Sequence, residues 1–397
     1  MIDIIDKSQC TGCSACSSIC PQMAISMQMD KEGFFYPVVE AEKCVSCGLC
    51  KKTCPVENSN ISSNKDTYAV LAQNKMNDIR TVSSAGGIVG AIYSYVFSRG
   101  GVAFGSGFNS DNTVSYIKVE TLEQCYENKI FSSKYTTSFL GDIFLQVKKE
   151  LLTERLVCFV GLPCHVAGLK NYLKREYDNL ILVDLICYGV PSGKLYKKYL
   201  DFLEEKYKSR ITDVRFRDKS FGYAAPTMCV EFDNHKVRSQ NSDIKSYLRC
   251  FFENISSRPS CYQCNFKTIN RVSDFTVGDC RSVFKFSKKM DDDLGTTVLY
   301  VHSAKGTDVL ANIENNINRF EVSVDDIIKT SGQKMIESAT KNPKRDAFFA
   351  EIDTLSYIKL INKYCPPSTT EKFVNIFKGI LLVTGLNKTG ILKKIKK

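Results

Sequence analysis

The sequence predicts an α/β protein, in which a small cysteine-rich N-terminal module precedes a larger body built around a largely parallel sheet. Three observations predict this. A cysteine motif occurs twice in residues 1–55, a polar stretch follows it, and apolar runs of strand length then alternate with segments of helical periodicity. The chain has 397 residues and is 43% hydrophobic, which is enough for two or three domains with sizeable cores.

The N-terminal module contains "CTGCSACSSICP" (residues 10–21) and "CVSCGLCKKTCP" (residues 44–55). Both read C-x2-C-x2-C-x3-C-P, the spacing of bacterial ferredoxins with two 4Fe–4S clusters, in which the fourth cysteine of each run binds the other cluster. The predicted ligands of one cluster are Cys10, Cys13, Cys16 and Cys54, and those of the other are Cys44, Cys47, Cys50 and Cys20.

The competing explanations of these motifs fit less well. A zinc ribbon uses CxxC pairs rather than triplets with a fourth cysteine and a proline. A disulfide framework belongs to a secreted chain, and residues 1–9 contain no apolar signal segment. We therefore expect a reducing, cytoplasmic location and a two-cluster ferredoxin-like domain over residues 1–60.

The first part of the body is expected over residues 67–150, after the polar linker "NSNISSNKD" (residues 58–66). "TYAVLAQ" (67–73) predicts a strand, and the loop "SSAGG" (83–87) leads into an amphipathic helix that Gly100 and Gly101 end. "VAFGSGF" (102–108) predicts the next strand.

The second part of the body is expected over residues 151–320. Residues 155–189 predict a βαβ unit, whose two near-continuous apolar strands are typical of a buried parallel sheet. A helix capped by Ser192 follows, and a more antiparallel part should be joined to the body after Ile211. Residues 321–397 are expected to be a helical, basic C-terminal region.

A second set of cysteines lies in this part. Cys164 and Cys187 follow the two strands of the βαβ unit, at the sheet edge where parallel sheets place their sites. Cys261 and Cys264 form a CxxC pair. Together they predict a site with four thiolates for a third metal centre, with Cys280 as a spare ligand. The alternative is that they are packed as small buried residues, as we expect for Cys125, Cys158 and Cys229.

The net charge of +11 is unevenly distributed, because residues 366–397 carry seven lysines and one acid. The tail "FVNIFKGILLVTGLNKTGILKKIKK" (373–397) could be an interfacial helix on the inner face of an anionic membrane or a helix docked on the body. Gly379, Gly385 and Gly390 weaken any long helix there. The sequence contains no apolar run of ~18 residues that could span a membrane and no basic-aromatic array for nucleic acid.

Two hydroxyl-rich segments point to an anionic ligand. "SSAGG" places Ser83, Ser84 and a flexible backbone at a helix start, where exposed N–H groups bind phosphate. It lacks the Lys-Ser/Thr of a P-loop, which argues against nucleotide triphosphate hydrolysis. "SSKYTTS" (132–138) adds a lysine and further hydroxyls.

These segments, with "FVGLPCHVAGLKNYL", "VDLICYGVPSGKLYKKYL", "RFRDKSFGY" and "RPSCYQCNFKTINRVSDFTVGD", resemble the deazaflavin-coenzyme hydrogenase/dehydrogenase beta-subunit family over residues 67–310. The N-terminal module resembles that family's frequent ferredoxin extension. The resemblance implies FAD, a cluster in the flavin domain, and hydride exchange with a soluble partner or substrate. It implies that the flavin is lined by Ser84, Gly86, Gly87, Ser133, Lys134, Tyr135 and Ser138, with Arg217 and Lys219 nearby.

The substrate end departs from the family pattern. Tyr223 and Arg281 stand where family members often have tryptophan, and "PCQ" is replaced by Pro163-Cys164-His165. His165 and Lys219 are the candidates for proton transfer, although a hydrogen-bonded structural role is the simpler expectation for His165.

The expected function is that of an iron–sulfur flavoprotein oxidoreductase, which passes single electrons from its clusters to FAD and a hydride to a small-molecule substrate. The electron donor would be ferredoxin or a reduced deazaflavin or nicotinamide. The protein would act in surface-polysaccharide or other small-molecule biosynthesis. One alternative is an electron-transfer subunit whose catalytic partner is another chain. A second is a cluster-binding tether without turnover. The fusion of cluster donor and flavin module in one chain favours the enzyme.

Overall fold

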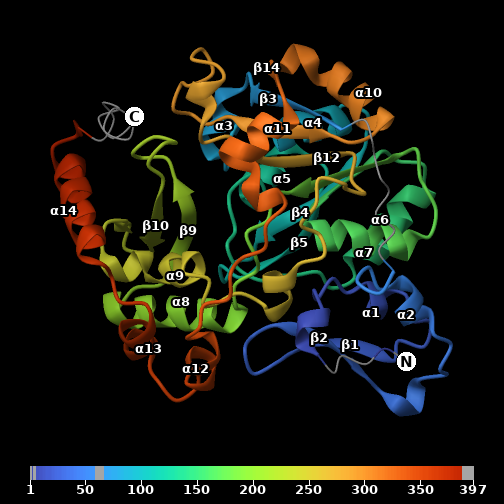
Figure 1. Cartoon of the computed structure of the whole chain (residues 1–397), viewed down its shortest axis with the longest axis horizontal. Helices are drawn as coiled ribbons and strands as arrows, with labels where there is room; N and C mark the ends of the chain where they lie inside the picture. Colours follow the sequence, from blue (N-terminus) through green and yellow to red (C-terminus); the bar gives the residue numbers. More distant parts are fainter. Residues whose placement is uncertain (1, 3–5, 59–66, 387–397) are drawn as a thin grey trace.

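The computed structural model describes residues 2, 6–58 and 67–386 (Figure 1). Most of the predicted linker, and the tail beyond residue 386 with Gly390 and Ile391, lie outside these residues. In the N-terminal module, α1 (Ala15–Ser18) and α2 (Leu49–Thr53) pack beside the antiparallel hairpin of β1 (Ile25–Met29) and β2 (Phe35–Val39). Gly12 and Gly48 precede these helices with φ of +72° and +73°, a conformation that glycine adopts without strain.

The body is built on a nine-stranded sheet in the order β14-β3-β13-β12-β8-β7-β4-β5-β6. Its strands are β3 (Tyr68–Asn74), β4 (Val102–Phe108), β5 (Val114–Val119), β6 (Ser138–Phe139), β7 (Val157–Gly161), β8 (Leu180–Leu185), β12 (Phe275–Asp279), β13 (Thr297–Val301) and β14 (Ile317–Val322). The centre, β12-β8-β7-β4, is parallel as predicted, and the remaining pairs are antiparallel apart from β5 with β6. The α/β fold class is confirmed.

Helices cover both faces of this sheet (Figure 1). On one face lie α4 (Ile88–Phe97) and α10 (Ala304–Ile313), and on the other α6 (Ile143–Leu152) and α7 (Pro163–Leu173). Side chains of β7 alternate between the two cores, with Cys158 in the first and Val157 and Phe159 in the second. Shorter helices connect the strands: α3 (Asn77–Val82), α5 (Leu122–Glu127) and α11 (Val324–Ile327).

A second lobe contains the antiparallel sheet of β9 (Ile211–Asp218), β10 (Thr227–Phe232) and β11 (Val237–Arg238), in agreement with the expectation for the chain after Ile211. Its aromatic-rich core includes residues of α8 (Gly193–Tyr207), α9 (Ser242–Phe252), α12 (Arg345–Ala350) and α13 (Tyr357–Tyr364). Ser192 caps α8 by accepting from the backbone N–H of Leu195, at 3.1 Å. The helix α14 (Thr369–Val383) lies along the outer edge of the lobe.

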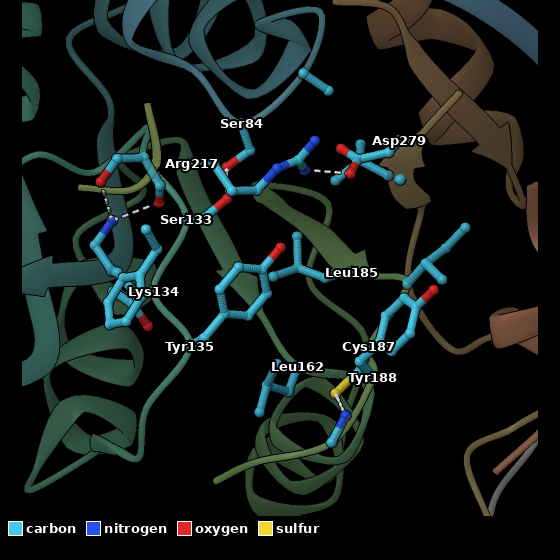
Figure 2. A pocket seen from close by; sticks show the side chains of 18 of the residues that line it. Ser84, Ser133, Lys134, Tyr135, Leu162, Leu185, Cys187, Tyr188, Arg217 and Asp279 are labelled. Atoms are coloured by element: carbon cyan, nitrogen blue, oxygen red, sulfur yellow. Dashed lines mark hydrogen bonds and ion pairs between the residues drawn. The ribbon is translucent and has the colours of Figure 1, made fainter. Parts of the chain in front are cut away.

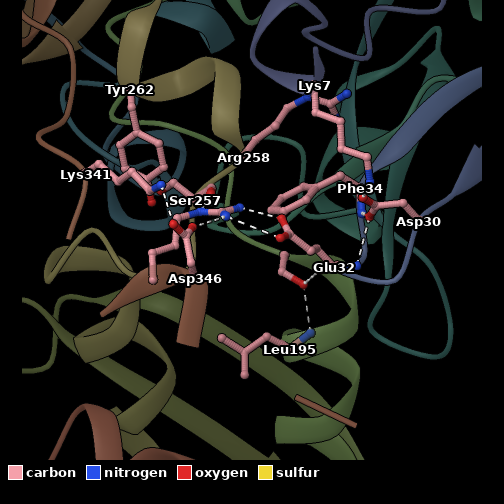
Figure 3. A network of polar contacts seen from close by, with 12 residues as sticks. Lys7, Asp30, Glu32, Phe34, Leu195, Ser257, Arg258, Tyr262, Lys341 and Asp346 are labelled. Carbon is pink, nitrogen blue, oxygen red and sulfur yellow. Dashed lines mark hydrogen bonds and ion pairs between the residues drawn. The ribbon is translucent and has the colours of Figure 1, made fainter. Parts of the chain in front are cut away.

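The N-terminal module is held against the body by a buried polar network (Figure 3). The guanidinium of Arg345 donates to Glu32 Oε2 at 2.6 Å and to the backbone oxygen of Ser257 at 3.0 Å. Ser192 Oγ donates to the backbone oxygen of Glu32 at 2.5 Å. Because these residues come from the hairpin of the module and from three segments of the body, the network fixes the position of the module.

We expect Arg345→Met to lower the free energy of unfolding by about 3 kcal/mol, because it leaves the largely buried carboxylate of Glu32 without its cation. Anaerobic denaturant titration of the intact protein measures the change. Lys341→Met is the control: it removes the exposed ion pair between Lys341 and Asp346 and should cost less than about 0.5 kcal/mol. Equal losses in the two variants would contradict the role of Arg345.

Candidate redox site

The structure brings the first predicted ligand set together. Burial, and then the neighbouring thiols of Cys10 and Cys54, raise the pKa of Cys13 to about 12. The pKa of Cys16 is also raised, by burial and then by Cys13, Cys10 and Cys54. Four thiols thus lie close enough to repel one another when ionised. Such a set becomes favourable as thiolates when cationic iron compensates the charge.

The second predicted set lines one small pocket of the module. Its four members are Cys20, Cys44, Cys47 and Cys50. Cys47 is exposed, so this pocket reaches the protein surface. Cys50 and Cys16 are buried in one cluster, against which Cys20 and Cys54 also pack, so the two sets adjoin.

The third set converges at the edge of the central sheet. Cys164 lies in the first turn of α7, Cys187 follows β8, and the CxxC pair lies in and directly after the 3-10 turn Pro259–Gln263. The pKa of Cys164 is raised by burial and then by Cys264, Cys187, Cys13 and Cys261. The four thiols are therefore neighbours, and the first set is adjacent through Cys13.

Hydrogen-bond donors surround the sulfurs of the third set. The backbone N–H of Gly189 donates to Cys187 Sγ and that of Val190 to Cys261 Sγ, both at 3.3 Å. The ammonium of Lys267 donates to the backbone oxygen of Cys187, and its charge lowers the pKa of that cysteine. Burial is the largest influence on Cys187 and acts in the opposite direction, raising its pKa. Donors of this kind stabilise thiolates and tune the potential of a cluster.

Among the residues described here, no three His, Cys, Asp or Glu side chains could hold a single metal ion. The cysteine sets fit a cluster better than one ion, because the four cysteines of a 4Fe–4S cluster bind four different irons. Cys280 is not a member of the third set. It is buried in a separate core with Val283 and Tyr300, and serine hydroxyls are close to its thiol.

A cavity of about 1220 Å³ lies beside the third set (Figure 2). This volume exceeds the ~300–1,000 Å³ of pockets for drug-sized ligands. Most residues that the sequence predicts at the flavin line it: Ser83, Ser84, Gly87, Ser133, Lys134, Tyr135, Ser138 and Arg217. His165 and Cys187 line it as well.

One wall of the cavity is suited to an anion. Ser133 Oγ donates to Ser84 Oγ at 2.8 Å, which joins the two hydroxyl-rich segments. Gly87 caps α4 in the left-handed conformation, with φ of +76°, and the N-terminus of this ten-residue helix adjoins the cavity. Unpaired N–H groups and the helix dipole attract phosphate at such a place.

The cavity also holds a buried cation with unused donors. Arg217 pairs through Nη1 with Asp279, and Figure 2 shows its side chain reaching across the cavity above Tyr135. Its Nε and Nη2 are buried and have no hydrogen-bond partner in the described part of the chain. Because unpaired buried donors are costly, these atoms favour a ligand with acceptor groups.

Two predicted residues do not line the cavity. Gly86 is a packing residue: a Cβ there would meet the backbone oxygen of Ala72 at 2.4 Å, and its N–H donates to Thr297 Oγ1. The ammonium of Lys219 donates to backbone oxygens of Arg80, Ala85 and Leu294, so it holds loops together. Burial lowers the pKa of Lys219 to about 8.

Lys134 and His165 line the cavity but are engaged elsewhere. The ammonium of Lys134 donates to the backbone oxygens of Lys129, Ile130 and Ser132, and burial lowers its pKa to about 7. His165 Nδ1 lies 2.8 Å from the hydroxyl of Tyr116, and burial lowers the pKa of this imidazole to about 3. His165 is therefore neutral and hydrogen-bonded, which agrees with the structural role expected for it from the sequence.

Arg258 is a residue of this site that the sequence did not single out. It is buried and lines the cavity, while its Nε donates to the backbone oxygen of Cys10 at 2.7 Å and its Nη2 approaches Cys10 Sγ at 3.6 Å. Its charge lowers the pKa of Cys261, against the larger effect of burial. The feature of the sequence that could have identified Arg258 is its position three residues before the CxxC pair.

The fold and the two N-terminal cysteine motifs define the class: an iron–sulfur protein related to the electron-transferring oxidoreductases. Residues 9–58 match the family "4Fe-4S dicluster domain". Residues 154–326 match the family of the C terminus of the "Coenzyme F420 hydrogenase/dehydrogenase" beta subunit. These two matches confirm the resemblance seen in the motifs of the chain.

A solved structure is also similar, that of an F420-reducing [NiFe] hydrogenase complex from Methanosarcina barkeri treated with xenon. Its matching chain is 14% identical, with a TM-score of 0.46, and the match covers 69% of the present chain and 91% of that chain. No curated protein is similar enough to count as a match.

Proposed function

We propose that this protein is an electron-transfer subunit of the hydrogenase/dehydrogenase beta-subunit type, which passes electrons between its clusters and a flavin in the large cavity. The observation that carries the proposal is the serial arrangement of the thiols. The set with exposed Cys47 adjoins the set with Cys13, which adjoins the set with Cys164, and Cys187 of that third set lines the cavity.

The proposed ligand sets are those predicted from the sequence, with Cys164, Cys187, Cys261 and Cys264 as the third. Arg258 would position the first and third sets relative to each other, because it contacts Cys10 and also lines the cavity. Lys267 and the N–H groups of Gly189 and Val190 would lower the cost of placing negative sulfurs in the interior.

The cavity fits FAD by the chemistry of its walls. Ser84, Ser133 and the N-terminus of α4 would bind the phosphates, and Arg217 would use its unpaired Nε and Nη2 on a polar edge of the flavin ring. A flavin supplies conversion between one-electron and two-electron transfer. Tyr135 and Leu185 provide apolar surface in the same space.

Catalysis on a small substrate within this chain is the second candidate. It is favoured by the size of the cavity, whose lining extends beyond the flavin residues to Arg281, Lys285 and Lys334. The neutral His165 and the loop-bound Lys219 offer no free proton donor, however, and this favours the subunit. Mixing the reduced protein with a soluble two-electron carrier distinguishes the two candidates. The carrier alone reoxidises an electron-transfer subunit, whereas an enzyme also needs its small substrate.

We expect the double variant Arg217→Met/Asp279→Asn to bind FAD at least ~10-fold more weakly, because it removes the charge-assisted donors without leaving an unpaired carboxylate. Flavin fluorescence during anaerobic titration measures the affinity. Arg215→Met is the control on the same strand, since Arg215 does not line the cavity. Unchanged affinity in the double variant would exclude this flavin site, and iron content checks that the fold is intact.

A further inference from the structure

The C-terminal helix α14 is docked on the body by its polar side. Glu371 forms an ion pair with Arg249 at 2.7 Å, Asn375 Oδ1 accepts from Lys245 Nζ at 2.5 Å, and Lys378 Nζ donates to the backbone oxygen of Ala225 at 3.0 Å. Asn375 and Lys378 are buried. This is the reverse of an ordinary surface helix, which buries its apolar side against the core.

The apolar side of α14 faces outward. Phe373, Ile376 and Ile380, at helical spacing, are 68%, 62% and 55% exposed, and Val374, Phe377 and Leu382 are exposed beside them. Of the apolar side chains of this helix that the structure describes, only Leu381 is buried, against Phe221 and Ala225. A stripe of large exposed side chains on one helix is an interaction surface rather than scattered surface residues.

Charge identifies the occupant of this surface. Residues 387–397, which follow the described part of the chain, contain five lysines and no acidic residue. The single acid of residues 366–397 is Glu371, which is neutralised by Arg249. Binding at a membrane surface has two contributions, the insertion of apolar side chains and the attraction of cations to anionic headgroups. The apolar stripe of α14 provides the first, and the cluster of lysines after it provides the second.

We propose that α14 and the lysines after it bind the surface of an anionic membrane, with Phe373, Ile376, Phe377 and Ile380 inserted at the headgroup boundary. No helix in the described part of the chain is long and apolar enough to span a bilayer, so the contact is peripheral. Figure 1 shows α14 at the edge of the molecule, away from the N-terminal module, which leaves the cluster-bearing end free for a redox partner.

The contact lies beside the cavity. Glu371 of α14 lines the cavity, as do Lys245 and Arg249, which hold the helix. A carrier or partner that reaches the cavity would therefore do so close to the membrane surface. The membrane inference rests on α14 alone and is independent of the cofactor assignment.

The test is co-sedimentation of the full-length protein with vesicles. With phosphatidylcholine vesicles containing about 30% phosphatidylglycerol, we expect at least ~10-fold more bound protein than with pure phosphatidylcholine, and loss of binding in high salt. The triple variant Phe373→Ser/Ile376→Ser/Ile380→Ser should lose the binding. The matched control is Leu145→Ser/Leu152→Ser/Phe320→Ser, which changes exposed apolar residues elsewhere and should bind as the wild type does.

Two outcomes would overturn the proposal. If the wild type does not pellet and light scattering shows a dimer that the triple variant converts to a monomer, the stripe is an interface between two copies. If the wild type does not pellet and is monomeric, the stripe serves neither purpose. Iron content and circular dichroism of the triple variant show whether its fold is intact, and wild-type pelleting decides the question even if it is not.

Discussion

Full-length Cys261→Ala, purified without oxygen, should contain about eight irons per chain where the wild type contains about twelve, since each 4Fe–4S cluster holds four. The reason is the convergence of Cys261 with Cys164, Cys187 and Cys264. Beyond the effect of burial, the other three thiols raise the pKa of Cys164, and Cys187 and Cys264 raise the pKa of Cys261. Removing one of four thiolates leaves an iron of that cluster without a protein ligand. Iron analysis and low-temperature electron paramagnetic resonance measure the loss.

The control for this variant is Cys229→Ala. Cys229 is buried on β10 in the second lobe, away from the third set, so its replacement should leave about twelve irons in place. If Cys261→Ala retains the iron content of the wild type, the four cysteines are packed thiols and the electron path runs from the N-terminal clusters to the cavity without a third carrier.

Cys47→Ala should remove the outermost cluster and slow reduction by an external protein donor by at least ~10-fold, because the set that contains Cys47 is the one that reaches the surface. Dithionite, a small reductant, should still reduce the remaining clusters. Stopped-flow spectroscopy with reduced ferredoxin measures the first effect, and anaerobic dithionite titration measures the second.

Val45→Ser is the matched control, since Val45 is exposed in the same loop and lines the same pocket without offering a thiolate. It tests whether disturbance of the loop alone slows the donor. Full iron content in Cys47→Ala would contradict the assignment of this set, and undiminished reduction despite the loss of iron would place the entry point elsewhere.

The grouping of the N-terminal cysteines was predictable from the sequence because their geometry is mostly local. In the spacing C-x2-C-x2-C, three sulfurs reach one cluster through a few turns of backbone, and Gly12 and Gly48 supply the positive φ that these turns need. The parallel centre of the sheet was predictable for a similar reason, since the continuous apolar runs of β7 and β8 are stable only with both faces covered.

The cavity was predictable only in part. The hydroxyl-rich segments pointed to Ser84 and Ser133, and the structure joins them by a hydrogen bond. In the structure, however, the ammonium of Lys134 donates to backbone oxygens, and Gly86 packs against its neighbours. A motif shows which residue types are present, but the direction of each side chain depends on the neighbouring loops that compete for it.

Sequence alone thus determined the number and spacing of the N-terminal cysteines, the α/β class and the surplus of lysines in the tail. Tertiary packing decided which distant groups meet: Arg258 with Cys10, Arg217 with Asp279, and the polar side of α14 with the body. The physical reason is that cysteine spacing and hydrophobic periodicity act over a few residues. Pairs separated by 62 residues, as Arg217 and Asp279 are, or by 248, as Cys10 and Arg258 are, depend on how whole elements pack.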